Sequence, residues 1–96
     1  MRIVLLAALA AASFSAAAQD SAPRNLAAAC AICHGTDGRA VTKDVNPLAG
    51  LAKDQFIARM TTFRNGTRPA TVMHQIAKGY SDQQIEQLAA YFAAQR

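Results

Sequence analysis

The sequence lacks the groups from which an independent catalytic site is usually assembled. It has only two cysteines, both in one short motif, so no further thiol is present to act as a nucleophile. It has no carboxylate pair with acid–base spacing and no glycine-rich loop of the kind that cradles phosphate. Its basic residues are dispersed without an aromatic stripe, which argues against nucleic-acid binding. An activity that needs its own nucleophile or acid–base pair is therefore not expected.

The sequence also lacks any stretch that alternates apolar and polar residues for long enough to predict a β-strand. It shows no internal repeat and no low-complexity linker. A chain of 96 residues has room for one hydrophobic core. Together these features predict a single all-α domain.

The first eighteen residues have the three-part pattern of a secretory signal peptide. Met1 and Arg2 give a positive start, residues 3–12 are an unbroken apolar run, and the alanines at 16–18 match a cleavage site. The alternative is a membrane anchor, but the apolar and small residues end at position 18, short of the roughly 20 that span a bilayer. We expect residues 1–18 to be removed and residues 19–96 to form a periplasmic domain.

Residues 30–34 carry the most informative motif, C-x-x-C-H. On a helix, residues three and four apart share a face, so Cys30, Cys33 and His34 can turn towards one flat partner. Two such thiols add to the vinyl groups of a porphyrin, while the imidazole coordinates its iron. The motif predicts one covalently attached c-type haem, and haem attachment outside the cytoplasm agrees with the predicted export.

Two other interpretations of the cysteine pair fit less well. A thioredoxin-like redox pair expects a βαβ unit around it, whereas alanine-rich helical sequence surrounds this one. A zinc site could use both cysteines and both histidines, but His34 and His74 are forty positions apart, far from the usual spacing of zinc ligands.

Four helical segments are expected in the mature chain. The first three are expected at residues 25–33, 53–64 and 69–79. Glycines at or just beyond their ends provide the stops. In the second segment the apolar residues recur at helical spacing and should face inward, namely Phe56, Met60 and Phe63.

The fourth helix is the clearest. Ser81 can cap it and Gln84 completes a capping box. Its apolar stripe consists of Ile85, Leu88, Ala89 and Phe92. So small a helical chain would be marginal alone, and we expect a haem to supply the missing apolar interior and the apoprotein to be largely unfolded.

The iron needs a second axial ligand, and the candidates in the mature chain are Met60, Met73, His74 and the lysines. Met60 lies within the apolar stripe of the second helix, which favours a core role. Met73 precedes the final helix and is far enough from His34 in the chain to approach the opposite haem face, so we predict that Met73 is the ligand. Its neighbour His74 is the alternative.

Several motifs together resemble a class I cytochrome c. They are C-x-x-C-H-G, the Leu-Ala-Gly at 48–50, FRNGTR at 63–68, Met73 and LAAYF at 88–92. The stretch TVMHQIAKGYS at 71–81 resembles more particularly the cytochrome subunit of flavocytochrome c sulfide dehydrogenase, in a single-haem form. The resemblance covers nearly all of the mature chain and implies a small class I cytochrome c fold, with about four helices wrapped around one covalent haem.

The resemblance also implies the roles of the site residues. It makes Cys30 and Cys33 the thioether links, and His34 and Met73 the axial iron ligands. One departure matters, because such relatives usually have a proline two residues before the Leu-Ala-Gly, where this chain has Asn46. Some carbonyl of this loop should still accept the Nδ1 proton of His34, since such bonds fix the imidazole, but the sequence leaves open which one.

A His/Met-ligated haem has no vacant position for a substrate, so the expected function is transfer of one electron rather than enzyme catalysis. The resemblance implies an electron-accepting subunit whose redox partner is a flavoprotein sulfide dehydrogenase subunit. The alternative is a freestanding soluble cytochrome c that carries electrons between respiratory complexes. A gas-binding or peroxidatic haem protein would require Met73 to be absent from the iron. Three cations are candidates for the haem rim or for steering an acidic partner, namely Arg64, Arg68 and Lys78.

Overall fold

The computed structural model describes residues 21–96, and the regular elements in that part of the chain are all helical, without a strand. The predicted leader at residues 1–18 lies outside the described residues. The elements in chain order are α3 (Ala22–Ala27), the 3₁₀ turn η1 (Ala28–Cys30), α4 (Ala31–His34), the 3₁₀ turn η2 (Thr36–Gly38), α5 (Lys53–Asn65), α6 (Met73–Ala77) and α7 (Asp82–Ala93). The predicted all-α fold class is confirmed.

The N-terminal helical run begins three residues earlier than predicted. Helix α3 starts at Ala22 because Pro23 falls in its first turn, where the fixed φ of proline is favourable and no amide donor is needed. The run continues through η1 into α4 and ends at Gly35, whose φ of 83° is unfavourable for other residues. The haem motif therefore occupies the C-terminal end of one helical run.

The second predicted helix is confirmed, and the third is shorter than predicted. Helix α5 ends at Asn65, and Gly66 follows in the left-handed conformation with φ of 80°. Helix α6 was expected to begin near Pro69 but begins only at Met73. Thr71 and Val72 precede it, and β-branched side chains lose rotamer freedom in a helical turn, which disfavours extending the helix through them.

Helix α7 is confirmed in its cap and in its buried face. The Ser81 hydroxyl accepts from the Gln84 amide at 3.1 Å, and the Gln84 side chain accepts from the Ser81 amide at 3.0 Å. All four residues of the predicted stripe are buried. The helix therefore begins directly after its predicted cap, Ser81, and its apolar face packs in the core.

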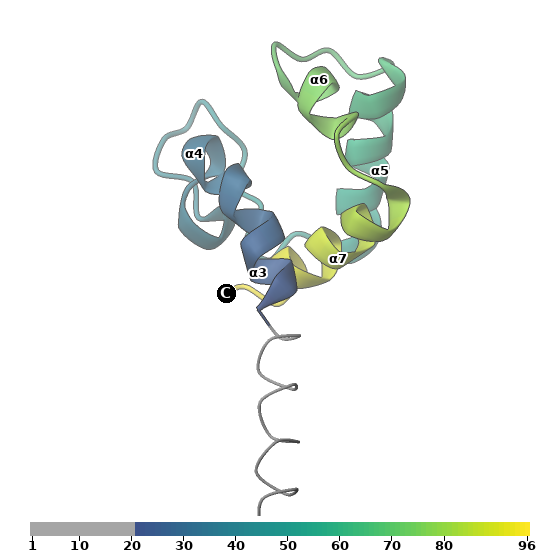
Figure 1. The fold of residues 1–96 in the computed structure, drawn as a ribbon. Helices are drawn as coiled ribbons and strands as arrows, with labels where there is room; N and C mark the ends of the chain where they lie inside the picture. Colours follow the sequence, from purple (N-terminus) through teal and green to yellow (C-terminus); the bar gives the residue numbers. More distant parts are fainter. Residues whose placement is uncertain (1–20) are drawn as a thin grey trace, which may run out of the picture.

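Helix α7 lies at the base of the fold, with α3–α4 and α5–α6 rising from it as two arms (Figure 1). Helices α3 and α5 both pack against α7, and α6 packs against α5. The Phe56 and Phe92 rings join α5 to α7, with their centroids 5.6 Å apart. The buried core consists of Ala27, Phe56, Met60, Ala77, Ile85, Leu88, Ala89 and Phe92. Met60 thus has the core role that its place in the stripe predicted.

Backbone hydrogen bonds through Gly38 fasten the segment after the haem motif to the rest of the fold. The carbonyl of Gly38 accepts from the amides of Leu48 at 2.8 Å and Ala49 at 3.1 Å. The amide of Gly50 donates to the Phe92 carbonyl at 2.8 Å. The loop at residues 46–50 is therefore fixed between the haem motif and the end of α7.

Gly38→Ala should destabilise the holoprotein severely. A Cβ at this position would lie 2.7 Å from the Ala49 nitrogen and 2.8 Å from both Leu48 Cβ and Phe92 Cδ1, in a backbone conformation with φ of 79°. Overpacking and left-handed strain together should cost about 2–5 kcal/mol of unfolding free energy, measured by denaturant titration.

Gly66→Ala is the matched control for that prediction. Gly66 has nearly the same φ, 80°, but a Cβ added there would meet no heavy atom within 4 Å. This variant should lose only about 1–2 kcal/mol, the cost of the left-handed conformation. Equal losses at the two glycines would contradict the close packing of Gly38.

Candidate haem-binding site

The three residues of the attachment motif lie at the end of the first arm. Cys30 closes η1 and is half-buried, whereas Cys33 in α4 is exposed, and both thiols are free of disulfides. Burial raises the pKa of the Cys30 thiol, while a hydrogen bond from the backbone partly opposes that rise. His34 is the last residue of α4. The helical run thus carries two available thiols and one imidazole within a single turn.

A hydrogen bond to the loop at residues 46–50 fixes the imidazole of His34. Its Nδ1 lies 2.7 Å from the carbonyl oxygen of Asn46. A carbonyl can only accept, so Nδ1 carries the proton and Nε2 keeps the lone pair that a metal ion requires. This answers the question that the sequence left open: the residue in the place of the usual proline supplies the carbonyl. A backbone acceptor does not depend on the side chain, so Asn serves here as proline would.

The two candidates for the second axial position lie on the other arm. Met73 is the first residue of α6, half-buried and packed against the core, and His74 follows it, also half-buried. Figure 1 shows α4 and α6 on opposite sides of the molecule above α7. Burial raises the pKa of Tyr80, which follows α6, and the charge of an ionised Cys30 would add to that rise. Met73 and His34 are therefore carried on different arms of the same fold.

The partly buried apolar side chains around the core are candidates to contact a large flat hydrophobic group. Several are only half-buried against the core, and they come from both arms and from the loop at 46–51. A chain of this size would normally bury more of its apolar surface, so a porphyrin is a suitable complement.

A cavity of about 480 Å³ is lined by the loop at 46–51 and by the guanidinium-bearing residues Arg59 and Arg68. Both arginines are half-buried, and neither forms an ion pair with a carboxylate within residues 21–96. Arg68 lies over the Phe63 ring, 5.5 Å from its centroid. Half-buried cations without an acidic partner favour an anion, so this cavity suits the two propionate carboxylates of a haem.

Of the three rim cations expected from the sequence, only Arg68 lines this cavity. Arg64 instead donates to Asp82 at 2.5 Å and to the Tyr80 carbonyl at 3.4 Å, which joins α5 to the start of α7. Lys78 is exposed. Arg59 was missed, because in a single sequence nothing distinguishes it from any other cation on the polar side of α5.

The zinc alternative finds no support in the part of the chain that the structure describes. No three His, Cys, Asp or Glu side chains gather there in a way that could hold a metal ion. His74 in particular does not join the cysteines. Nor is any helix within residues 21–96 both long and apolar enough to cross a membrane.

Comparison with known families agrees with the site. A family model described as cytochrome c oxidase, cbb3-type, subunit III matches residues 17–92, most of the chain. The chain belongs to this family of cytochrome c haem domains. Its all-helical structure agrees with the class I cytochrome c fold that the sequence predicted. Its cofactor is haem c, one per chain and covalently attached, and electron transfer is the function that membership of this family supports.

Individual relatives are cytochromes of more than one kind. The cytochrome subunit of sulfide dehydrogenase from Chlorobaculum tepidum is 37% identical over 67 residues, covering 70% of this chain and 60% of that protein. Cytochrome c4 from Pseudomonas aeruginosa is 33% identical over 81 residues, covering 84% of this chain and 40% of that protein. Cytochrome c-554(548) from Halomonas halodenitrificans is 33% identical over 69 residues, covering 69% and 83%. The chain thus spans only part of the first two.

Proposed function

We propose that the chain is exported to the periplasm and transfers electrons through a haem with His34 and Met73 as axial ligands. Cys30 and Cys33 would form the thioether links. The observation that carries this proposal is the hydrogen bond from His34 Nδ1 to Asn46, because it presents Nε2 as a ligand. Export is proposed from the leader pattern at residues 1–18.

In this proposal each group of residues has a physical task. When bound, the haem supplies one-electron chemistry at its iron. The Asn46 carbonyl accepts a hydrogen bond from Nδ1–H and so keeps the imidazole in one tautomer and orientation. Arg59 and Arg68 would bind the propionates, and the half-buried apolar side chains exclude water. Exclusion of water and a thioether ligand such as Met73 both favour the ferrous state, which gives a high reduction potential.

We further propose that the partner is a flavoprotein sulfide dehydrogenase subunit, from which this chain accepts electrons. The similarity to the Chlorobaculum tepidum subunit and the stretch at residues 71–81 support this assignment. The exposed apolar side chains of Val72 and Ile76 lie within that stretch, and exposed apolar surface favours a lasting interface. A freestanding carrier is the second candidate, supported by the similarity to cytochrome c-554(548) along most of that protein's length.

Purification of the tagged holoprotein from its own periplasmic extract separates these two candidates. The subunit assignment predicts a one-to-one complex with a flavin-containing protein that survives high salt, and haem reduction on addition of sulfide. Recovery of a flavin-free monomer whose haem is not reduced by sulfide would contradict the subunit assignment. It would favour the freestanding carrier.

Ile76→Asp should weaken that complex by roughly tenfold, because it places a charge in an apolar contact. Gln75→Asp is the matched control, since it makes a similar charge change at the exposed neighbouring residue. Binding can be measured by titration of the separated subunits. Equal effects of the two variants would show that charge, and not apolar contact, determines the affinity.

A further inference from the structure

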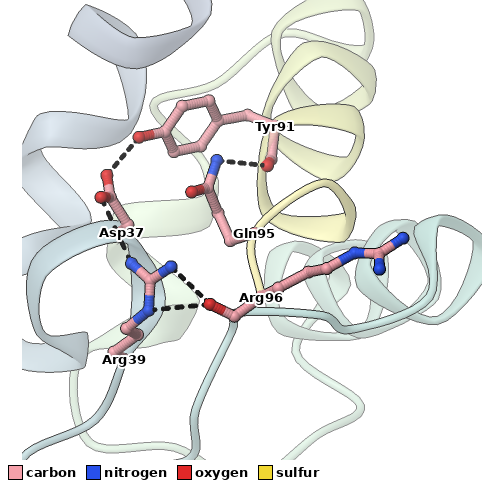
Figure 2. A network of polar contacts seen from close by, with 5 residues as sticks. All are labelled: Asp37, Arg39, Tyr91, Gln95 and Arg96. Atoms are coloured by element: carbon pink, nitrogen blue, oxygen red, sulfur yellow. Dashed lines mark hydrogen bonds and ion pairs between the residues drawn. The ribbon is translucent and has the colours of Figure 1, made fainter.

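A polar network joins the turn after the haem motif to the C-terminal end of α7 (Figure 2). The Tyr91 hydroxyl donates to one carboxylate oxygen of Asp37, and Arg39 donates to the other at 3.3 Å. Arg39 also donates to the carbonyl oxygen of Arg96 from Nε at 3.2 Å and from Nη2 at 2.6 Å. The Gln95 side chain donates to the Tyr91 carbonyl at 3.0 Å. These residues lie outside the site proposed for the haem, and electron transfer does not by itself require them.

The network continues by backbone hydrogen bonds to His34. Asp37 lies in η2, directly before Gly38. The Gly38 carbonyl accepts from the amides of Leu48 and Ala49, and Asn46, two residues before Leu48, accepts from His34 Nδ1. Contacts with α7 thus fix the position of η2. The hydrogen bonds of Gly38 in turn fix the loop that carries the Asn46 carbonyl.

Asp37 has a left-handed backbone conformation, and both of its carboxylate oxygens are hydrogen-bonded. Asp37 is the one non-glycine residue within 21–96 with a positive φ, 55°. Aspartate adopts this conformation more readily than most residues do, so η2 keeps its turn while the side chain bonds to α7. The hydrogen bond from Tyr91 lowers the pKa of Asp37, and Arg39 and Arg24 lower it further against a desolvation effect that raises it. Asp37 therefore stays ionised and keeps its bonds at neutral pH.

We propose that Tyr91 and Asp37 are positioning residues for the axial histidine. They hold η2 and the loop at 46–50 so that the Asn46 carbonyl makes a short hydrogen bond to His34 Nδ1, and they thereby adjust the reduction potential. This inference rests on the proposed role of His34 as an iron ligand. When Nδ1–H donates to a carbonyl, the imidazole becomes a more basic ligand, which stabilises the ferric state. A substitution at Tyr91 or Asp37 that weakens the hydrogen bond between His34 and Asn46 should therefore raise the reduction potential of the haem.

The experiment compares Tyr91→Phe and Asp37→Asn holoproteins with wild type. Phenylalanine keeps the ring, which makes a T-shaped contact with Phe92 at a centroid distance of 5.3 Å, and asparagine tolerates a positive φ. Two quantities are measured: the midpoint potential, and the rate of solvent exchange of the His34 Nδ1 proton by NMR of the ferrous protein. Both variants should show a higher potential and exchange faster by roughly two- to tenfold, the factor for one net hydrogen bond.

Asp82→Asn is the matched control, because it removes the ion pair with Arg64 that joins α5 to α7 without touching η2. It should leave the potential and the Nδ1 exchange rate unchanged. The inference is overturned if Tyr91→Phe and Asp37→Asn also leave both unchanged, or if Asp82→Asn changes them equally. If wild type itself shows no haem-shifted Nδ1 resonance, the ligand role proposed for His34 fails instead, so the two failures are distinguishable.

Discussion

Cys33→Ala should yield little stable holoprotein, with at most one thioether link to the haem. The thiol at this position is exposed and free, so its loss removes a covalent link without disturbing the buried core. The effect on folding should nevertheless be large. The described core contains only eight buried apolar residues, three of them alanines, and a domain so small needs the additional interior that the haem supplies.

Haem retention and helix content measure this effect. Wild type should keep its haem through denaturation and acid–organic extraction, whereas the variant should mature poorly and unfold at a lower denaturant concentration. Ile32→Ala is the matched control, because Ile32 lies between the two cysteines in sequence and is 87% exposed. A Cys33→Ala protein that matures and unfolds like wild type would contradict the proposed link. Haem that extracts freely from wild type would contradict covalent attachment.

Met73→Ala should open the sixth position of the iron. The ferrous form should then bind carbon monoxide, and the potential should fall because the thioether that favours ferrous iron is gone. Met73 is half-buried at the first residue of α6, so the substitution should cost less packing energy than a change in the fully buried core. The absorption spectrum, the carbon monoxide titration and a potentiometric titration together measure the result.

Two control variants separate ligation from packing. Met60→Leu changes a methionine that is 6% exposed in the core, and this swap of similar volume should cost under about 1.5 kcal/mol and leave the spectrum unchanged. His74→Ala should also leave the low-spin spectrum unchanged. If Met73→Ala retains the low-spin spectrum and His74→Ala does not, the ligand is His74. The reduction potential should then be lower than that of a haem with His and Met ligands.

The features that the sequence determined by itself are local. The C-x-x-C-H motif lies within five residues, and helix geometry alone places its thiols and imidazole together. The capping box between Ser81 and Gln84 spans four residues, and the apolar stripe of α7 follows from its periodicity. Helix α5 was predicted to within a residue, because the Asn-Gly pair at its end has a strong conformational preference.

Other features were decided only by the tertiary structure. The choice of Asn46 as the acceptor for His34, the convergence of Arg59 and Arg68 on one cavity, and the bond between Tyr91 and Asp37 all join residues that are far apart in the chain. The late start of α6 reflects the weak helical preference of the residues before it, which the short apolar pattern did not reveal. Periodicity indicates which face of a helix is buried, but not which distant loop lies against it. Those contacts depend on how α7 brings the two arms together, since the free energy of such packing comes from surfaces that meet only in the folded chain.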